Sequence, residues 1–251
     1  MKTGIIHSFV QEQLSSWPLA ADNFKALEKV HVREVQVNGL TVRLQFNPAR
    51  MISSAAKLTK ADIARRPCFL CEANRPDVQT NIPFESPAGN QYHILVNPYP
   101  IFPDHLVIAL KEHKAQSIMG RCEDMLALAQ EFEGYTLFYN GPCCGASAPD
   151  HHHFQAAPRG LMALEAEIDA AISEGRYSGT EQSLTELYIF NDAALYHYDR
   201  FSTGIFAISS KSQEAAIHVF YKLLEAAEIQ EGDTEPRINL YSWWTGNEYR
   251  T

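Results

Sequence analysis

The sequence predicts an α+β fold in which an antiparallel sheet is flanked by helices. Residues 31–46 alternate apolar and polar side chains around Asn38-Gly39, which is a strong signal for a two-residue hairpin. Residues 92–155 then follow the order strand, strand, helix, strand, strand. A similar order begins again after residue 186, so we expect a diverged tandem of two units.

Composition limits the classes of protein to which the chain can belong. Its 251 residues can bury a substantial core, and its net charge of −9, without a sustained Lys/Arg stripe, argues against nucleic-acid binding. No apolar run reaches the roughly 18 residues of a membrane span, and the N-terminus leads into a mixed polar segment rather than a signal-peptide core. We therefore expect a cytoplasmic monomer or homodimer that binds neither nucleic acid nor membrane.

The chain up to residue 172 can be assigned element by element. After a hairpin of residues 31–36 and 40–46, residues 47–64 form a long connection with a short helix near its end. The elements that follow are expected to be strands at 92–96 and 105–110, a helix at about 115–133, a strand at 135–139, a loop at 140–150, a strand that begins at His151, and a helix at 161–172.

The second unit is predicted from strands at 186–190, 203–209 and 237–244 and a helix at about 213–227. Val96-Asn97 and Phe190-Asn191 fall at corresponding places, although two units can also adopt a common order independently. The last strand is expected to be absent, because the chain either ends there naturally or is shortened. The predicted domains are 1–64 (hairpin and connecting segment), 65–160 (catalytic unit with a metal site) and 161–251 (degenerate second unit).

The run His151-His152-His153-Phe154-Gln155 is the most informative stretch of the chain. In a strand, side chains alternate between the two faces, so His151, His153 and Gln155 share one face, which becomes a candidate site. A surface histidine run or a fragment of an expression tag are the alternatives, but the run is internal and Ala-Ala-Pro-Arg follows it.

Cysteine spacing indicates a metal site rather than disulfides. The chain has five cysteines, and Cys68-Phe69-Leu70-Cys71 has the spacing that lets two sulfurs reach one ion. His113 and His151 could complete a Cys2His2 set, with His105 as the rival to His113. A closed set leaves no position for water, so the expected zinc is structural and aims His153. The alternative is a reduced cysteine pair packed in the core.

If His151 binds metal, His153 is free to act as a nucleophile, with Gln155 two residues on and Ser147 in the preceding turn. Neutral imidazole attacks phosphorus well, and the resulting phosphoramidate is labile enough to pass its group onward. Covalent nucleotidyl transfer fits these residue types.

The chain resembles the transferase branch of the histidine-triad (HIT-like) superfamily, which contains galactose-1-phosphate uridylyltransferases, diadenosine tetraphosphate phosphorylases and GDP-hexose phosphorylases. The likeness covers residues 47–155. It is carried by Asn47-Pro48 with Arg50, Cys68-Phe69-Leu70-Cys71, Val96-Asn97, Pro103-Asp104-His105-Leu106-Val107, Lys111-Glu112-His113, Asn140, Gly145-Ala146-Ser147 and His151-x-His153-x-Gln155.

The resemblance implies a HIT-like antiparallel sheet and a role for each motif residue. His153 would be nucleotidylated, Gln155 would hydrogen-bond the transferred phosphoryl group, and zinc would be the only cofactor. The residues implied in substrate binding are Arg50, Asn97, Asn140, Gly145 and Ser147, and those implied in metal binding are Cys68, Cys71, His113 and His151. Asn97 is also explained as a turn residue before Pro98, and Arg50 as a solvated loop charge.

Gln155 favours transfer over hydrolysis for a chemical reason. A phosphate leaving group has a second pKa of about 6, so it departs without a general acid. The third histidine that the hydrolase branch carries at this position is then not needed. The expected substrates are a nucleotide sugar or dinucleoside polyphosphate with phosphate or a sugar phosphate as acceptor. The competing hypotheses are a nucleotide hydrolase of the same fold and a non-catalytic, zinc-stabilised nucleotide-binding protein.

Overall fold

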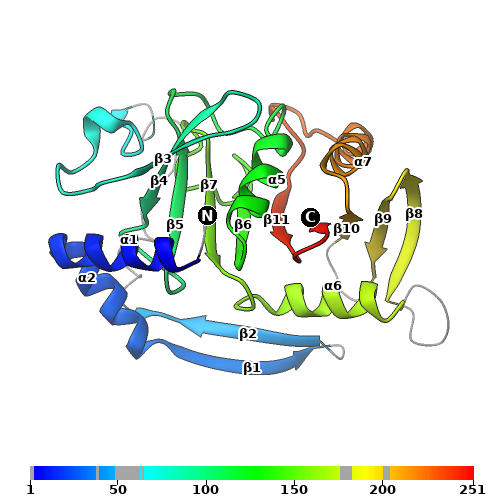
Figure 1. The fold of residues 1–251 in the computed structure, drawn as a ribbon, viewed down its shortest axis with the longest axis horizontal. Coiled ribbons are helices and arrows are strands. Elements are labelled where there is room, and N and C mark those ends of the chain that lie inside the picture. The colour runs from blue at the N-terminus through cyan, green and yellow to red at the C-terminus, as the bar shows by residue number, and fades with distance from the viewer. Residues whose placement is uncertain (1–2, 38–39, 49–62, 64, 176–182, 200–203) are drawn as a thin grey trace.

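The computed structural model describes residues 3–37, 40–48, 63, 65–175, 183–199 and 204–251. They form a two-stranded hairpin and a ten-stranded sheet in which all neighbouring strands are antiparallel (Figure 1). The α-helices are α1 (Thr3–Ser16), α2 (Pro18–Lys25), α5 (Cys122–Glu131), α6 (Ala163–Ser173) and α7 (Gln213–Ala226). Short 3-10 helices are η1 (Ala26–Lys29) and η3 (Glu72–Asn74). The hairpin strands are β1 (His31–Val37) and β2 (Leu40–Phe46).

The large sheet is built from two copies of one arrangement. Its strand order is β3-β4-β5-β7-β6-β11-β12-β10-β9-β8. Read inward from either edge, the first three strands follow the chain order, and the fifth strand of the copy lies between the third and the fourth. Each copy also carries its helix, α5 or α7, between its third and fourth strands. The first copy contains β3 (Ile82–Glu85), β4 (Gln91–Val96), β5 (Leu106–Leu110), β6 (Tyr135–Asn140) and β7 (His153–Pro158). The second copy contains β8 (Leu184–Phe190), β9 (Ala193–Tyr198), β10 (Ile205–Ser210), β11 (Asn239–Trp244) and β12 (Tyr249–Arg250). The predicted α+β fold with a tandem arrangement is therefore confirmed.

Two details of the predicted second unit need correction. Its last strand is present, because β12 lies between β11 and β10 as β7 lies between β6 and β5, although β12 has only two residues. The strand β9 was not predicted, and it shifts the correspondence between the copies by one strand. Val96 ends β4, whose counterpart is β9, so Val96-Asn97 does not correspond to Phe190-Asn191, which ends β8.

Ion pairs occupy the second copy where the first carries its histidine strand. Arg250 on β12 pairs with Ser209 and Trp243 across the sheet. Its guanidinium lies 3.5 Å from a carboxylate oxygen of Asp169, which also accepts a hydrogen bond from Trp243 Nε1 at 3.2 Å. Arg250 and its partners thus occupy the place in the second copy that corresponds to β7 in the first.

The hydrophobic core lies between one face of the sheet and the helices α1, α5 and α7. Apolar side chains from both copies meet there, among them Ile94, Leu137 and Ile208, so both copies share one core. Helix α6 covers the opposite face of the second copy through Ile168 and Ala171. The candidate site lies on that same opposite face, because His153 and Gln155 alternate with the buried Phe154.

The N-terminal segment was predicted only as far as its hairpin, and the structure adds α1 and α2 in front of it. Helix α1 places Ile6, Phe9 and Val10 in the shared core. The pairing of β1 with β2 matches the predicted register, with His31 opposite Phe46. Asn38-Gly39, and most of the expected connection at 47–64, lie outside the described residues.

The helix predicted at 115–133 begins later than expected, at Cys122. Gly120 has φ +67°, a left-handed conformation that interrupts a helix, and the chain before it turns back towards the histidine strand. In the described part of the chain no helix has the length and apolar character needed to cross a membrane.

Glu235 joins the second copy to the first next to the site. Its buried carboxylate accepts a hydrogen bond from Ile118 N at 2.8 Å and one from the Tyr139 hydroxyl at 2.6 Å. Glu235→Leu removes both acceptors and leaves two buried donors unsatisfied, so we expect a loss of about 3 kcal/mol in unfolding free energy. Urea unfolding checks this, with Glu235→Gln as a control that keeps an acceptor. Equal midpoints for Glu235→Leu and wild type would contradict the role.

Candidate functional site

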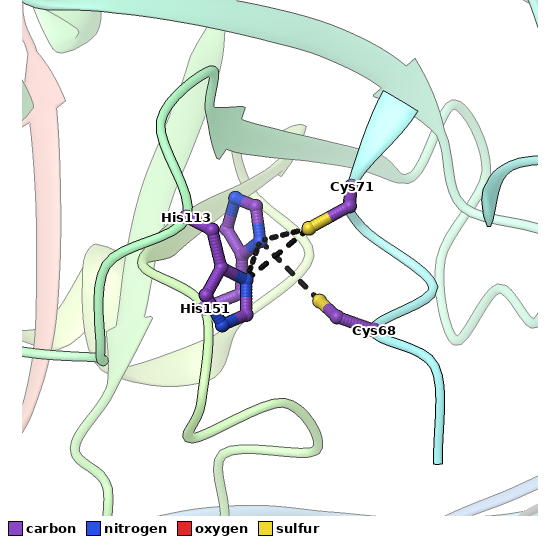
Figure 2. A group of neighbouring side chains, drawn as sticks. All are labelled: Cys68, Cys71, His113 and His151. Carbon is purple, nitrogen blue, oxygen red and sulfur yellow. Dashed lines mark hydrogen bonds between the residues drawn. The ribbon is translucent and has the colours of Figure 1, made fainter. Parts of the chain in front are cut away.

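Four predicted metal ligands come together on one side of the first copy. Cys68 and Cys71 lie in the loop before η3, His113 follows β5, and His151 lies two residues before β7. Their ligand atoms all lie within 4.8 Å of one another. Figure 2 shows the two thiols facing the two imidazole rings. The cluster could therefore hold a metal ion.

The distances suit a tetrahedral ion. With Zn–N bonds of about 2.05 Å and Zn–S bonds of about 2.3 Å, two nitrogens stand about 3.3 Å apart and a nitrogen and a sulfur about 3.5 Å. The Nδ1 atoms of His113 and His151 are 3.2 Å apart. The sulfur-to-nitrogen distances are 3.3 Å for Cys68–His151, 3.2 Å for Cys71–His113 and 3.5 Å for Cys71–His151.

His151 is oriented for metal binding by its second nitrogen. Its Nε2–H donates to the carbonyl of Leu110 at 2.6 Å, which leaves Nδ1 unprotonated and directed at the thiols. Burial lowers the pKa of His151, so its imidazole is neutral. Burial and the neighbouring Cys68 raise the pKa of the Cys71 thiol, which must give up its proton to a metal. His105, the alternative to His113 as a metal ligand, does not belong to the cluster. It lies beside Gln155.

His153 is the first residue of β7 and presents one nitrogen for chemistry. Its Nδ1–H donates to the backbone carbonyl of His151 at 2.8 Å, so Nε2 carries the lone pair. Burial lowers the pKa of His153 to about 4, while its bond to the His151 carbonyl acts in the opposite direction. The ring is therefore a neutral imidazole near pH 7, the form that attacks electrophiles.

Gln116 holds the backbone of His153, and the sequence analysis did not single it out. Its amide oxygen accepts from His153 N at 2.8 Å, and its Nε2 donates to the carbonyls of His153 and Asn140 at 3.0 Å each. One buried amide thus ties β7 to the end of β6. No local pattern marks such a residue, because its partners are distant in sequence.

Gln155 is held between two side chains. Its Oε1 accepts from His105 Nε2 and its Nε2 donates to Asn140 Oδ1, each at 3.1 Å. His105 Nδ1 accepts from Ile101 N at 3.2 Å, which fixes the protonated nitrogen of His105 as the one facing Gln155. The Gln155 amide is thus fixed on the face of β7 that also carries His153.

A family model described as a domain of unknown function, DUF4922, matches residues 9–158. The chain belongs to this family. The matched segment ends at Pro158, the last residue of β7, and so contains the whole first copy. The four clustered ligands, His153 and Gln155 all lie within the DUF4922 segment, whereas the second copy follows it.

Solved structures of yeast Ap4A phosphorylase Apa2 are also similar to this DUF4922 protein. The structure without a named ligand has 16% identity and a TM-score of 0.44, covering 93% of this chain and 76% of that chain. The AMP complex has 17% identity and a TM-score of 0.46, with 95% and 78% covered. The Ap4A complex has 15% identity and a TM-score of 0.48, with 93% and 78% covered. No curated protein sequence matches.

The remaining predicted contacts of the DUF4922 segment lie in two loops. Asn97 follows β4, and its Oδ1 accepts from Tyr99 N at 2.9 Å, which supports the turn interpretation. Gly145, with φ +96°, and Ser147 are exposed in the loop between β6 and β7. In the same loop a Cβ on Gly141 would stand 2.7 Å from the Ile238 carbonyl, so this position requires glycine. Arg50 lies outside the described residues.

Arg66 is a second residue that the sequence analysis missed. Its guanidinium donates to Asp150 at 2.9 Å and to the Ser147 carbonyl at 3.4 Å, and it lies 4.7 Å from the centre of the Phe69 ring. Arg66 thus links the cysteine loop to the loop that precedes His153. The ion pair between Arg66 and Asp150 lies just before the histidine run that leads into β7.

Proposed function

We propose that this protein is a nucleotidyltransferase of the phosphorylase type that works through a covalent nucleotidyl-His153. The observation that carries the proposal is the fixed tautomer of a buried imidazole, in which the backbone of His151 takes the Nδ1 proton and Nε2 stays free. General-base help is then unnecessary, because a neutral imidazole is already a nucleophile.

The reaction has two displacements at one phosphorus. His153 Nε2 attacks the α-phosphorus of a nucleotide sugar or dinucleoside polyphosphate, a P–N bond forms, and the P–O bond to the remaining phosphate ester breaks. The electron pair leaves with that phosphate oxygen, which needs no proton because the second phosphate pKa is about 6. An oxygen of inorganic phosphate or a sugar phosphate then attacks, and the P–N bond breaks to restore neutral His153.

The polar groups around His153 suit the charge of this phosphoryl group. Gln155 donates a neutral hydrogen bond and is oriented by His105 and Asn140. The Arg66 guanidinium is ion-paired with Asp150 and donates to the Ser147 carbonyl, and Ser147 and Gly145 are the exposed loop contacts that the resemblance implies. Zinc, held by Cys68, Cys71, His113 and His151, would act structurally by fixing His151. We place the reaction in the cytoplasm.

Covalent labelling tests the proposal. The protein is incubated with α-³²P-labelled GDP-, UDP- and ADP-sugars and with diadenosine tetraphosphate, denatured in alkali and digested, and the labelled peptide is mapped. Phosphoramidates survive alkali and acyl phosphates do not, so we expect alkali-stable label on the peptide that contains His153. Added phosphate should release the label as a nucleoside diphosphate. Label released as a monophosphate without phosphate would instead identify a hydrolase, and no label with any nucleotide would favour the binding protein.

Gln155→His should move the reaction towards hydrolysis. A histidine at this position can supply and remove protons, which contributes rate when water is the acceptor. We expect the ratio of nucleoside diphosphate to monophosphate products to fall at least about tenfold, which is less than the roughly 10²–10⁴-fold that an optimally placed general acid or base contributes. Chromatography of products at fixed phosphate measures the ratio. Gln155→Asn, an amide that cannot titrate, is the control and should slow the reaction without changing the ratio.

A further inference from the structure

The loop between β6 and β7, residues 141–152, carries the two exposed contacts Gly145 and Ser147 and leads into the strand of His153. Its first residue is held by the second copy, because Gly141 N donates to the carbonyl of Ile238 at 3.1 Å. That contact acts only at the start of the loop. The position of Ser147 therefore depends on contacts further along the chain.

The second half of this loop contacts the cysteine loop. Arg66 Nη2 donates to Asp150 Oδ1 at 2.9 Å and to the carbonyl of Ser147 at 3.4 Å. Ala148, which lies between these two residues in the chain, is fully buried in a small apolar cluster that includes Cys68. Cys68 also belongs to the metal cluster, so one short segment serves the metal cluster and holds Ser147 as well.

The ion pair between Arg66 and Asp150 is partly sheltered from water. The side chain of Arg66 is 25% exposed and that of Asp150 is 19% exposed, and the centre of the Phe69 ring lies 4.7 Å from the guanidinium. Solvent and salt screen such a pair less than a pair on the open surface. A planar guanidinium serves a carboxylate, a carbonyl and a ring at once, whereas the ammonium of a lysine is a point charge. These contacts therefore favour arginine over lysine at position 66.

Asp150 brings a negative charge close to His153. It directly precedes the histidine run, and although burial lowers the pKa of His153, the charge of Asp150 opposes this shift. A transferred phosphoryl group is anionic, so an unpaired carboxylate at this place would repel it. The ion pair with Arg66 offsets that repulsion.

We infer that Arg66 is a positioning residue for phosphoryl transfer. It fixes the Ser147 end of the loop to the cysteine loop, and it offsets the charge of Asp150 so that an anionic donor can approach His153. The effect on donor binding rests on the proposed function, whereas the joining of the two loops does not.

Hydrogen exchange of the full zinc-loaded chain, without nucleotide, tests how the loop is held. The amides of Cys144, Ala146 and His151 are hydrogen-bonded within the loop. Arg66→Gln should speed their exchange about threefold or more, because a partly sheltered ion pair contributes about that much to local stability. Arg65→Gln, at the exposed neighbouring position, is the control and should leave their exchange unchanged. Equal exchange in the two variants would overturn the positioning role.

A double substitution tests the charge. Arg66→Gln should raise KM for the donor that labels His153 at least about fivefold with little change in kcat, because Asp150 is then unpaired. Addition of Asp150→Asn removes the repulsion and should bring KM back to within about threefold of wild type. Arg66→Lys keeps the charge, so KM should stay near the wild-type value although exchange is faster.

The same variants separate this inference from the proposed function. An unchanged KM in Arg66→Gln, or a double variant with KM no lower than that of the single one, would overturn the role of the charge, because a residue needed only for folding gives no such rescue. Absence of label and turnover in wild type would overturn the proposed function. Faster exchange in Arg66→Gln than in Arg65→Gln would even then support the joining of the two loops, since that measurement uses no nucleotide.

Discussion

His153→Ala is expected to abolish alkali-stable labelling and to lower kcat/KM at least about 10³-fold, because no other described group can form the P–N bond at this place. Neighbouring nitrogens are unsuitable. His151 Nδ1 faces the thiols of the metal cluster, and His152 is buried on the opposite face against Tyr92, Tyr139 and Phe154. The measurement is steady-state phosphorolysis combined with quantification of labelled protein.

A matched control separates the loss of the nucleophile from the loss of the fold. His218→Ala removes a histidine on α7, far along the sheet from the site, where its ring stacks on Phe190. It should keep full labelling. The unfolding free energy of His153→Ala should lie within about 1 kcal/mol of the wild-type value, because the main-chain hydrogen bonds of residue 153 with Gln116 do not depend on the ring. Full labelling of His153→Ala would exclude this residue as the nucleophile.

Local periodicity explains what the sequence could predict of the site. The two-residue period of a strand is a property of the backbone, so it correctly places His153 and Gln155 on one face and Phe154 on the other. The metal cluster is also local in origin, since a Cys-x-x-Cys loop brings its own two sulfurs together. The structure then brings His113 and His151 to that loop, as their positions next to predicted strands suggested.

Two elements that were not predicted, α1 and β9, have sequence patterns typical of a helix and of a hairpin. Ile6, Phe9, Val10 and Gln13 are the buried residues of α1 and have helical spacing, although the segment reads as mixed and polar. Strand β9 follows Asn191-Asp192, a two-residue connection in which Asn191 has φ +53°, and this pair is a hairpin signal. The late start of α5 was harder to predict, because residues 115–121 combine helix-forming residues with a single glycine.

Tertiary contacts explain what the sequence could not predict. Gln116 and Glu235 act through hydrogen bonds to backbone atoms that are 24 to 117 residues away, and nothing in their own neighbourhoods marks them. The ion pair of Arg66 with Asp150 likewise joins two residues that are 84 positions apart in the chain.

Removal of one metal ligand is expected to have the largest effect on stability. Cys68→Ser should abolish stoichiometric zinc and lower the unfolding free energy by more than about 3 kcal/mol, because metal binding to a preformed site contributes directly to folding. Metal analysis and urea unfolding measure the two effects. Cys143→Ser is the control, since Cys143 is exposed and lies outside the cluster, so its zinc content should equal that of wild type. Unchanged metal content in Cys68→Ser would remove Cys68 from the site.

Cys68→Ser should also slow the reaction in the protein that stays folded, because the metal cluster and His153 both depend on His151. The side chain of His151 belongs to the cluster, and its carbonyl takes the Nδ1 proton of His153 at 2.8 Å. When His151 is released, the carbonyl can turn and His153 can exchange tautomers, so a smaller fraction presents a free Nε2. We therefore expect kcat to fall about tenfold or more with little change in KM, and labelling by limiting nucleotide to slow in proportion. A purely structural cluster would instead lower the amount of active protein and leave kcat per labelled site unchanged.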